Sequence, residues 1–318
     1  MIIKGYRVGP LVRATAKETL ADNIMGLAAQ TAYYFFFSLF PLFLFAAPLL
    51  SLIGDKQVMI EGVMSRLAGT LPGDAIDLVR GVVQDVVLAE SAPGLMSIGA
   101  LLAAWAGSNI FSGLIDALNR AYDVEEGRTW WKKRLLALAS VITAGLVLLT
   151  ATAIMLGGEQ VTEWLARQLG LGALAVMMWT TLQYPLAFAL LVATAWMIYY
   201  FLPNIRQDRT QVLVGAIVAT LLWILVTLVF RAYVVNFGSY SKTYGTVGGV
   251  IALLTWMYLS MLVLLIGGEL NAEIHHGTGA VEPRAGAVYA GQILSGSTSR
   301  APSTERVERA AALRLGAP

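Results

Sequence analysis

Six long apolar stretches, separated by connections that carry most of the charges, are the feature that most constrains how this chain can fold. They cover approximately residues 24–53, 95–115, 135–156, 176–202, 212–230 and 247–268. An α-helix needs roughly 20 apolar residues to cross the hydrocarbon core of a bilayer. The sequence therefore predicts an all-α fold, that of a polytopic membrane protein with six transmembrane helices. The first stretch is longer than a straight span requires and contains Pro41 and Pro48, which predict tilt and a kink.

The composition agrees with a lipid environment and excludes several kinds of chemistry. Hydrophobic residues make up 57% of the chain and charged residues 13%, and the mean hydropathy is +0.69. The net charge of +2 is too small for a nucleic-acid binder, because phosphate binding needs a clustered basic face. The chain has no cysteine and only two histidines. We therefore expect no catalytic constellation, no metal site and no cofactor.

The distribution of the basic residues predicts the orientation of the spans. Sixteen of the 22 Lys and Arg residues lie in the N-terminal segment, the second and fourth connections and the C-terminal segment. Basic residues concentrate on the cytoplasmic side of short connections. We therefore expect a bacterial inner-membrane protein with both termini in the cytoplasm. No apolar run precedes the first span, so we expect no cleavable signal peptide.

Three parts of the chain follow from this pattern. Residues 1–22 are expected to form a cytoplasmic N-terminal segment, 23–275 the six-helix transmembrane domain and 276–318 a disordered cytoplasmic tail. Between the first and second spans, apolar residues recur at helical spacing from Ile76 to Val87. This spacing predicts short amphipathic helices at the membrane interface. Trp130 and Trp131, followed by three basic residues, are typical of an interfacial anchor that faces anionic lipid.

Several ordered motifs carry a resemblance to a known family. They are TAYYFFFSLFPLFLF at 31–45, LNRAYDVEEGRTWWKKRLLAL at 118–138, YYFLPN at 199–204, GAIVATLLWILVTLVFRAYVVNFGSY at 215–240 and YGTVGGVIALLTWMYLSMLVLLIGGELNAEI at 244–274. Together they resemble the YihY/BrkB family of bacterial inner-membrane proteins, over nearly all of residues 23–274. The resemblance implies six membrane helices with cytoplasmic termini, and a role in transport or envelope maintenance.

Members of this family, which includes virulence factor BrkB, have sometimes been labelled ribonuclease BN. The residues argue against that activity here. Metal-dependent RNA cleavage needs a cluster of His and Asp ligands. His275 and His276 are adjacent and are the only histidines in the chain, so they do not supply such a cluster.

Polar groups inside the spans are the candidates for function, because they are costly in lipid and usually face the bundle interior or a water path. In the second span and just after it, polar residues recur at helical spacing, and Asp116 stands four residues before Arg120. The second and sixth spans are both expected to end at the cytoplasmic face. We therefore predict a polar cluster or substrate pathway there, with these members: Asn109, Asp116, Asn119, Arg120, Glu269 and Asn271. Gln30 of the first span is a further candidate for this pathway. The alternative is that these groups only tie helices together by hydrogen bonds.

Small residues recur every four positions in two spans and predict close helix packing. They are Gly99, Ala103 and Gly107 in the second span, and Gly215 and Ala219 in the fifth.

Three functions are compatible with these features. The leading hypothesis is a transporter or exporter of an amphipathic or envelope-related compound, whose partners are membrane lipids and a small-molecule or lipid-like substrate. The second is an envelope-maintenance protein that scaffolds partners without transport. An intramembrane enzyme ranks last, because no Ser/Lys dyad, aspartate pair or metal-ligand set is present. Association into a homo-oligomer is left open.

Overall fold

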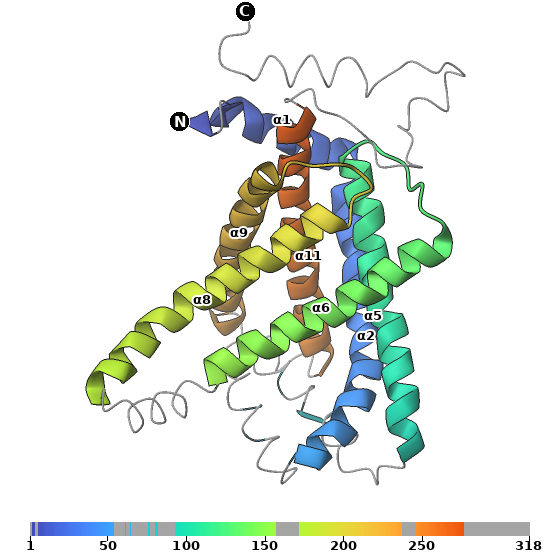
Figure 1. The fold of residues 1–318 in the computed structure, drawn as a ribbon, viewed down its shortest axis with the longest axis vertical. Coiled ribbons are helices and arrows are strands. Elements are labelled where there is room, and N and C mark those ends of the chain that lie inside the picture. Colours follow the sequence, from blue (N-terminus) through green and yellow to red (C-terminus); the bar gives the residue numbers. More distant parts are fainter. Residues whose placement is uncertain are drawn as a thin grey trace, which may run out of the picture. The chain divides into compact units, whose positions relative to one another are not determined.

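The structure is a computed structural model, and it describes residues 2–3, 6–53, 93–156, 172–236 and 246–276, with five isolated positions at 61, 64, 76, 80 and 81. Helices dominate the described part of the chain (Figure 1). The helices are α1 (Val8–Ala21), α2 (Ile24–Ile53), α5 (Pro93–Ala121), α6 (Trp130–Leu156), α8 (Gly172–Phe201), α9 (Arg209–Asn236) and α11 (Thr246–His276). Ahead of α1, the two-residue strands β1 (Ile2–Ile3) and β2 (Tyr6–Arg7) pair antiparallel, with Ile2 opposite Arg7.

Six of these helices are long and apolar enough to cross a membrane. The spans are Ile24–Phe45, Ser97–Ala121, Trp130–Ala151, Thr181–Phe201, Arg209–Val234 and Val247–His276. The predicted all-α class with six transmembrane helices is therefore confirmed, apart from the short N-terminal hairpin. The chain is a multi-pass membrane protein.

Several predictions about the connecting segments fall outside what the structure describes. Of the region predicted to form short amphipathic helices, only the five isolated positions are described, so those helices stay a prediction. The predicted disordered tail lies beyond His276, outside the described residues. Helix α2 runs through both Pro41 and Pro48, and the kink predicted there is likewise untested.

Helix α1 was not expected from the hydropathy pattern. Helix α1 occupies the N-terminal segment and buries Leu11, Ala14, Thr15 and Thr19 on one face. These buried residues are mostly small or polar, so a search for apolar runs passes over them. Helix α11 ends eight residues beyond the approximate end of the sixth apolar stretch at Gly268, and its candidate span includes these residues.

Residues with positive φ mark two helix ends. Asn23 (φ 55°) separates α1 from α2, and Asp123 (φ 55°) follows α5. After α5, the Val124 N–H donates to the Asn119 carbonyl (2.9 Å) and the Asp123 N–H to the Arg120 carbonyl (3.0 Å). This pair of bonds is the Schellman arrangement, which ends a helix and turns the chain sharply. It fixes the position of Tyr122 and Val124.

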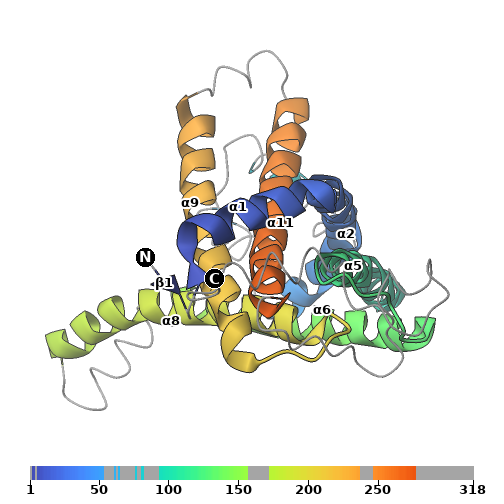
Figure 2. The same ribbon diagram turned by 90° about the horizontal axis from the view of Figure 1, so that it is seen from above.

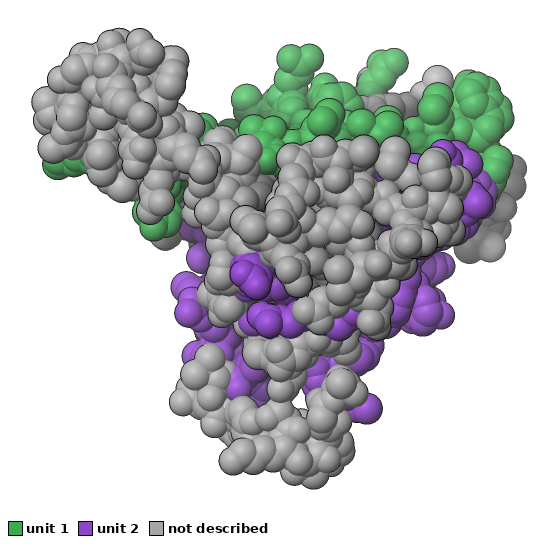
Figure 3. All heavy atoms as spheres, turned by 90° about the horizontal axis from the view of Figure 1, so that it is seen from below, with its two compact units in different colours: residues 1–15, 118–220, 267–318 green, residues 16–117, 221–266 purple. Residues whose placement is uncertain are grey.

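The chain forms two compact units, each built from separate segments (Figure 3). Unit 1 comprises residues 1–15, 118–220 and 267–318, and unit 2 comprises residues 16–117 and 221–266. Within unit 1, α6 packs against α8. Helix α9 runs beside α11 in both Figure 1 and Figure 2. Both helices are divided between the units, α9 after residue 220 and α11 after residue 266.

The core of unit 2 is apolar and aromatic. Ala32, Leu253 and Met257 are buried, and six partly buried side chains of α2 and α11 pack against them: Phe35, Phe36, Leu39, Trp256, Tyr258 and Met261. Trp223 of α9 donates its indole N–H to Ser260 Oγ of α11 (3.0 Å). Gly99 of α5 lies against the α2 backbone, since a Cβ there would be 3.0 Å from Phe45 N.

Candidate functional site at the end of helix α11

The last ten residues of α11 form the centre of unit 1. Every residue from 267 to 276 is buried. Five of them are polar, each no more than 3% exposed: Glu269, Asn271, Glu273, His275 and His276. We call these five residues the polar end of α11. Ionisable side chains inside a span are costly and commonly mark functional sites.

Two glycines bring neighbouring segments of unit 1 against α11. A Cβ on Gly267 would lie 2.5 Å from Tyr199 Oη and 2.6 Å from Ala219 Cβ. A Cβ on Gly268 would lie 2.5 Å from Leu118 Cδ2. These positions therefore admit no side chain unless their neighbours shift, and they allow α8, α9 and the end of α5 to approach α11 closely.

Asn271 holds α9 against α11 through both atoms of its amide. Its Oδ1 accepts the Gly215 N–H at 2.8 Å, and its Nδ2 donates to the Val212 carbonyl at 3.1 Å. A Cβ on Gly215 would collide with the Asn271 side chain and the Gly267 carbonyl. The two hydrogen bonds of the Asn271 amide therefore require a glycine at position 215.

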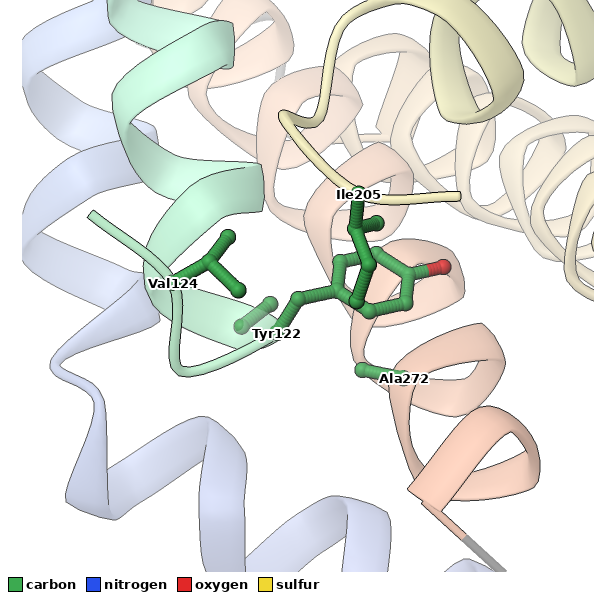
Figure 4. Close-up of a cluster of buried hydrophobic side chains, with 5 residues drawn as sticks. Tyr122, Val124, Ile205 and Ala272 are labelled. Atoms are coloured by element: carbon green, nitrogen blue, oxygen red, sulfur yellow. The ribbon is translucent and has the colours of Figure 1, made fainter. Parts of the chain in front are cut away.

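Tyr122, the first residue after α5, contacts the same end of α11. Figure 4 shows its ring extending toward α11, where it packs with Ile205 and Ala272 in a buried cluster. The ring centroid lies 5.8 Å from that of His275 in an edge-to-face arrangement. Burial raises the pKa of the Tyr122 hydroxyl far above its ordinary value, and the charge of Glu269 raises it further. Tyr122 therefore keeps its proton and donates it to Gln207 Oε1 at 2.6 Å.

A hydrogen-bond network joins the two connections that flank this cluster. We call it the connector network, and its members are Asn119, Tyr122, Glu126, Arg128, Asn204 and Gln207. Glu126 and Arg128 form a two-pronged ion pair, with Nε–Oε1 at 2.7 Å and Nη2–Oε2 at 2.8 Å. Arg128 Nη2 also donates to the Leu202 carbonyl at 2.6 Å, which ties the connection after α5 to the end of α8.

Asn119 links the two halves of this network. Its Nδ2 donates to Glu126 Oε2 at 3.0 Å, and its Oδ1 accepts the Asn204 N–H at 2.7 Å. Gln207, which accepts the Tyr122 hydroxyl, donates from Nε2 to the Tyr199 carbonyl at 2.8 Å. The network therefore fixes the entry of the chain into α6 and α9 relative to Tyr122.

The Glu126 carboxylate is held in its charged form. Partial burial raises its pKa, but hydrogen bonds from the Arg128 side chain and backbone, the Arg128 charge and the Asn119 amide outweigh that effect. The net result is a pKa below the ordinary value of 4.5. The ion pair with Arg128 is thus intact at neutral pH.

The predicted site residues fall into two groups. Asn119, Glu269 and Asn271 are buried in unit 1, and Arg120 is in unit 1 but exposed. Gln30, Asn109 and Asp116 belong to unit 2, where Gln30 and Asp116 are exposed and Asn109 is half-buried. Gln30 Nε2 donates to Tyr34 Oη at 3.0 Å. Of the predicted packing residues not described above, Gly107 is buried and Ala103 half-buried.

Sequence reasoning missed most of the connector network. Tyr122, Glu126, Arg128 and Asn204 lie in irregular connections, where no periodicity signals burial. Their one signal was membership of the motifs at 118–138 and 199–204. Among the described residues, no group of three or more His, Asp and Glu side chains is placed to hold a metal ion.

Six spanning helices with a buried polar helix end define a polytopic α-helical membrane protein. The family described as Virulence factor BrkB matches residues 15–288, and the chain belongs to this family. The resemblance to the YihY/BrkB family is thereby confirmed.

Similar proteins span most of the chain. The ribonuclease-like protein YfkH of Bacillus subtilis (strain 168) is 32% identical over 248 residues, which are 78% of this chain and 89% of that protein. A UPF0761 membrane protein of Pseudoalteromonas atlantica is 26% identical over 277 residues, 83% of this chain and 85% of its own. Another, of Aeromonas salmonicida, is 24% identical over 254 residues, 79% of this chain and 84% of its own. No solved structure matches the chain.

Proposed function

We propose that this chain is a transporter or exporter of an amphipathic, envelope-related compound. The observation that carries the proposal is the polar end of α11, which is buried within a helix able to span a membrane. Ionisable groups in such positions commonly line substrate or ion pathways, or relay protons. In this proposal, Glu269 and its buried neighbours handle the polar part of the substrate or a coupling ion.

Hydrogen bonding between helices does not by itself account for this composition. A single neutral amide is enough to connect two helices here, because Asn271 joins α9 to α11 by two hydrogen bonds. Glu269, Glu273 and the two histidines add ionisable groups that such a tie does not require. Their burial in the same three turns favours a functional role over a purely structural one.

We also propose that the protein lies in the bacterial inner membrane with both termini in the cytoplasm. The excess of Lys and Arg in the terminal segments and in the second and fourth connections supports this orientation. Reporter fusions test it. A cytoplasmic reporter fused after residue 318 is expected to be active and a periplasmic reporter inactive, and the reverse pattern would contradict the orientation.

The transport proposal is tested with the purified chain in lipid vesicles. We expect uptake or release of at least one solute from a panel of metabolites and lipid-like compounds, above that of protein-free vesicles. Glu269→Gln is expected to abolish this flux, because it removes a buried ionisable group while preserving shape. Glu125→Gln is the matched control, since Glu125 is an exposed carboxylate in the connection after α5. Absence of flux across the whole panel would instead favour the non-transporting scaffold.

We propose no ribonuclease activity for this chain, although the Bacillus relative is named ribonuclease-like. The chain contains two histidines and no cysteine, and both histidines are adjacent at the end of α11. An RNA-cleavage assay on the purified protein is the direct check, and we expect no cleavage above that of the detergent buffer.

A further inference from the structure

The start of α6 carries aromatic and basic side chains that the proposed function does not use. We call them the α6 patch: Trp130, Trp131 and Lys132 are exposed, and Lys133 and Arg134 are half-buried. Trp130 is 70% exposed and Trp131 57% exposed, so both indoles stand outside the protein core. The membrane-spanning part of α6 begins at Trp130, which places the patch at the end of a span.

The α6 patch places three cations close to a helix start. The first turns of a helix favour acidic side chains, because the helix dipole places partial positive charge there. Just before α9, the Asp208 carboxylate accepts the Thr210 N–H at 2.9 Å, although the first turn of α9 itself has no acidic residue. Helix α6 likewise has no acidic residue in its first turn, and it carries three consecutive cations near its start. Glu126, four residues before Trp130, is already held by Arg128.

The geometry of the patch suits a negatively charged membrane surface. Lys132 is exposed, and its Nζ lies 5.4 Å from the centre of the Trp131 ring. Indoles favour the level of the lipid headgroups, and basic residues at that level attract anionic lipid. Because Lys132 lies against the Trp131 ring, an indole at the headgroup level keeps the ammonium group at that level too, near the lipid phosphates.

We propose that the α6 patch binds the headgroups of anionic phospholipids, with Lys132 and Trp131 as its principal contacts. This proposal is independent of transport, since it rests on exposed residues rather than on the polar end of α11. Binding would also restrain the connection between α5 and α6, because Arg128 stands two residues before the patch and holds the Leu202 carbonyl.

The test titrates the full chain in detergent with phosphatidylglycerol or with phosphatidylcholine. Native mass spectrometry counts the bound lipids, and the melting temperature reports the resulting stabilisation. Wild type is expected to bind phosphatidylglycerol more tightly than phosphatidylcholine. Lys132→Gln should weaken phosphatidylglycerol binding about five-fold, the typical effect of one lysine near an anionic surface. Lys132→Arg should retain it, and Trp131→Leu should weaken it without a change of charge.

Lys17→Gln is the matched control, because Lys17 is an exposed lysine on α1. It is expected to leave phosphatidylglycerol binding unchanged. Three results would overturn the proposal: equal affinity for the two lipids, an equal loss in Lys17→Gln and Lys132→Gln, or the same stabilisation by inorganic phosphate as by phosphatidylglycerol.

Discussion

The two units of this chain build their cores from different materials, although α9 and α11 contribute to both. In unit 2, α11 packs Leu253 and Met257 against aromatic side chains of α2. In unit 1, the same helix buries two carboxyl groups, an amide and two imidazoles. Apolar packing in lipid relies on shape and dispersion, whereas buried polar groups require specific partner atoms. The comparison teaches that unit 1 should tolerate substitution far less well than unit 2.

The largest effect on stability is expected from Arg128→Gln in unit 1. The change removes the ion pair with Glu126 and the bond to the Leu202 carbonyl, and leaves a partly buried carboxylate without its cation. Hydrogen bonds to charged groups contribute about 1.5–3 kcal/mol, so we expect a loss of about 3 kcal/mol. Denaturant unfolding in detergent measures it. Arg120→Gln, at an exposed arginine, should change stability little, and equal losses in both variants would contradict the network.

Gly267→Ala tests the close approach to α11. The added methyl would meet Tyr199 Oη and Ala219 Cβ, and overpacking of this kind costs about 1–3 kcal/mol. The melting temperature should fall clearly below that of wild type. The same substitution at Gly145 of α6 is the control, because a Cβ there has nothing within 4 Å. Gly145→Ala should be neutral or slightly stabilising, since alanine favours helix.

Asn271→Leu replaces the amide by an apolar side chain of similar volume. The two hydrogen bonds to α9 are lost, at a net cost of about 1 kcal/mol each. Thermal unfolding in detergent should show this destabilisation. A variant as stable as wild type would show that unit 1 depends on volume rather than on specific polar contacts.

Acid should weaken unit 1 through Glu126. Its pKa is lower in the folded chain than the ordinary value of 4.5, so its stabilising effect is complete above that pH. The effect is lost as the pH falls below 4.5 and through the folded pKa. Stability curves should therefore show a decline in acid that is absent from Glu126→Gln. An identical decline in that variant would assign the acid sensitivity to other groups.

The smallest effect is expected from Met257→Leu in unit 2. Methionine and leucine have similar volumes, and such swaps in an apolar core usually cost less than about 1.5 kcal/mol. We expect the melting temperature to stay within a few degrees of wild type. A loss as large as that of Asn271→Leu would remove the distinction between the two cores.

The spans were predictable because lipid imposes a simple requirement, a long helical run of apolar residues. The ends of the helices were less so. The last eight residues of α11 continue the helix beyond the apolar stretch, and all of them are buried. Helix α1 escaped notice because its buried face is made mainly of alanine and threonine.

The candidate site shows a similar limit. Helical spacing placed Asp116, Asn119 and Arg120 on neighbouring positions of α5, but only Asn119 faces the interior. Spacing gives the relative positions of side chains around a helix and not the face that is buried. The partners of Asn119 lie in the connections after α5 and α8, and their contacts depend on turns that have no periodic signature.

The central claim is that the polar end of α11 serves transport rather than packing alone. The most direct measurement compares Glu269→Gln with wild type in a vesicle flux assay, at equal protein content and equal melting temperature. We expect flux to be lost in Glu269→Gln and kept in Glu125→Gln. Wild-type flux in a correctly folded Glu269→Gln variant would contradict this claim.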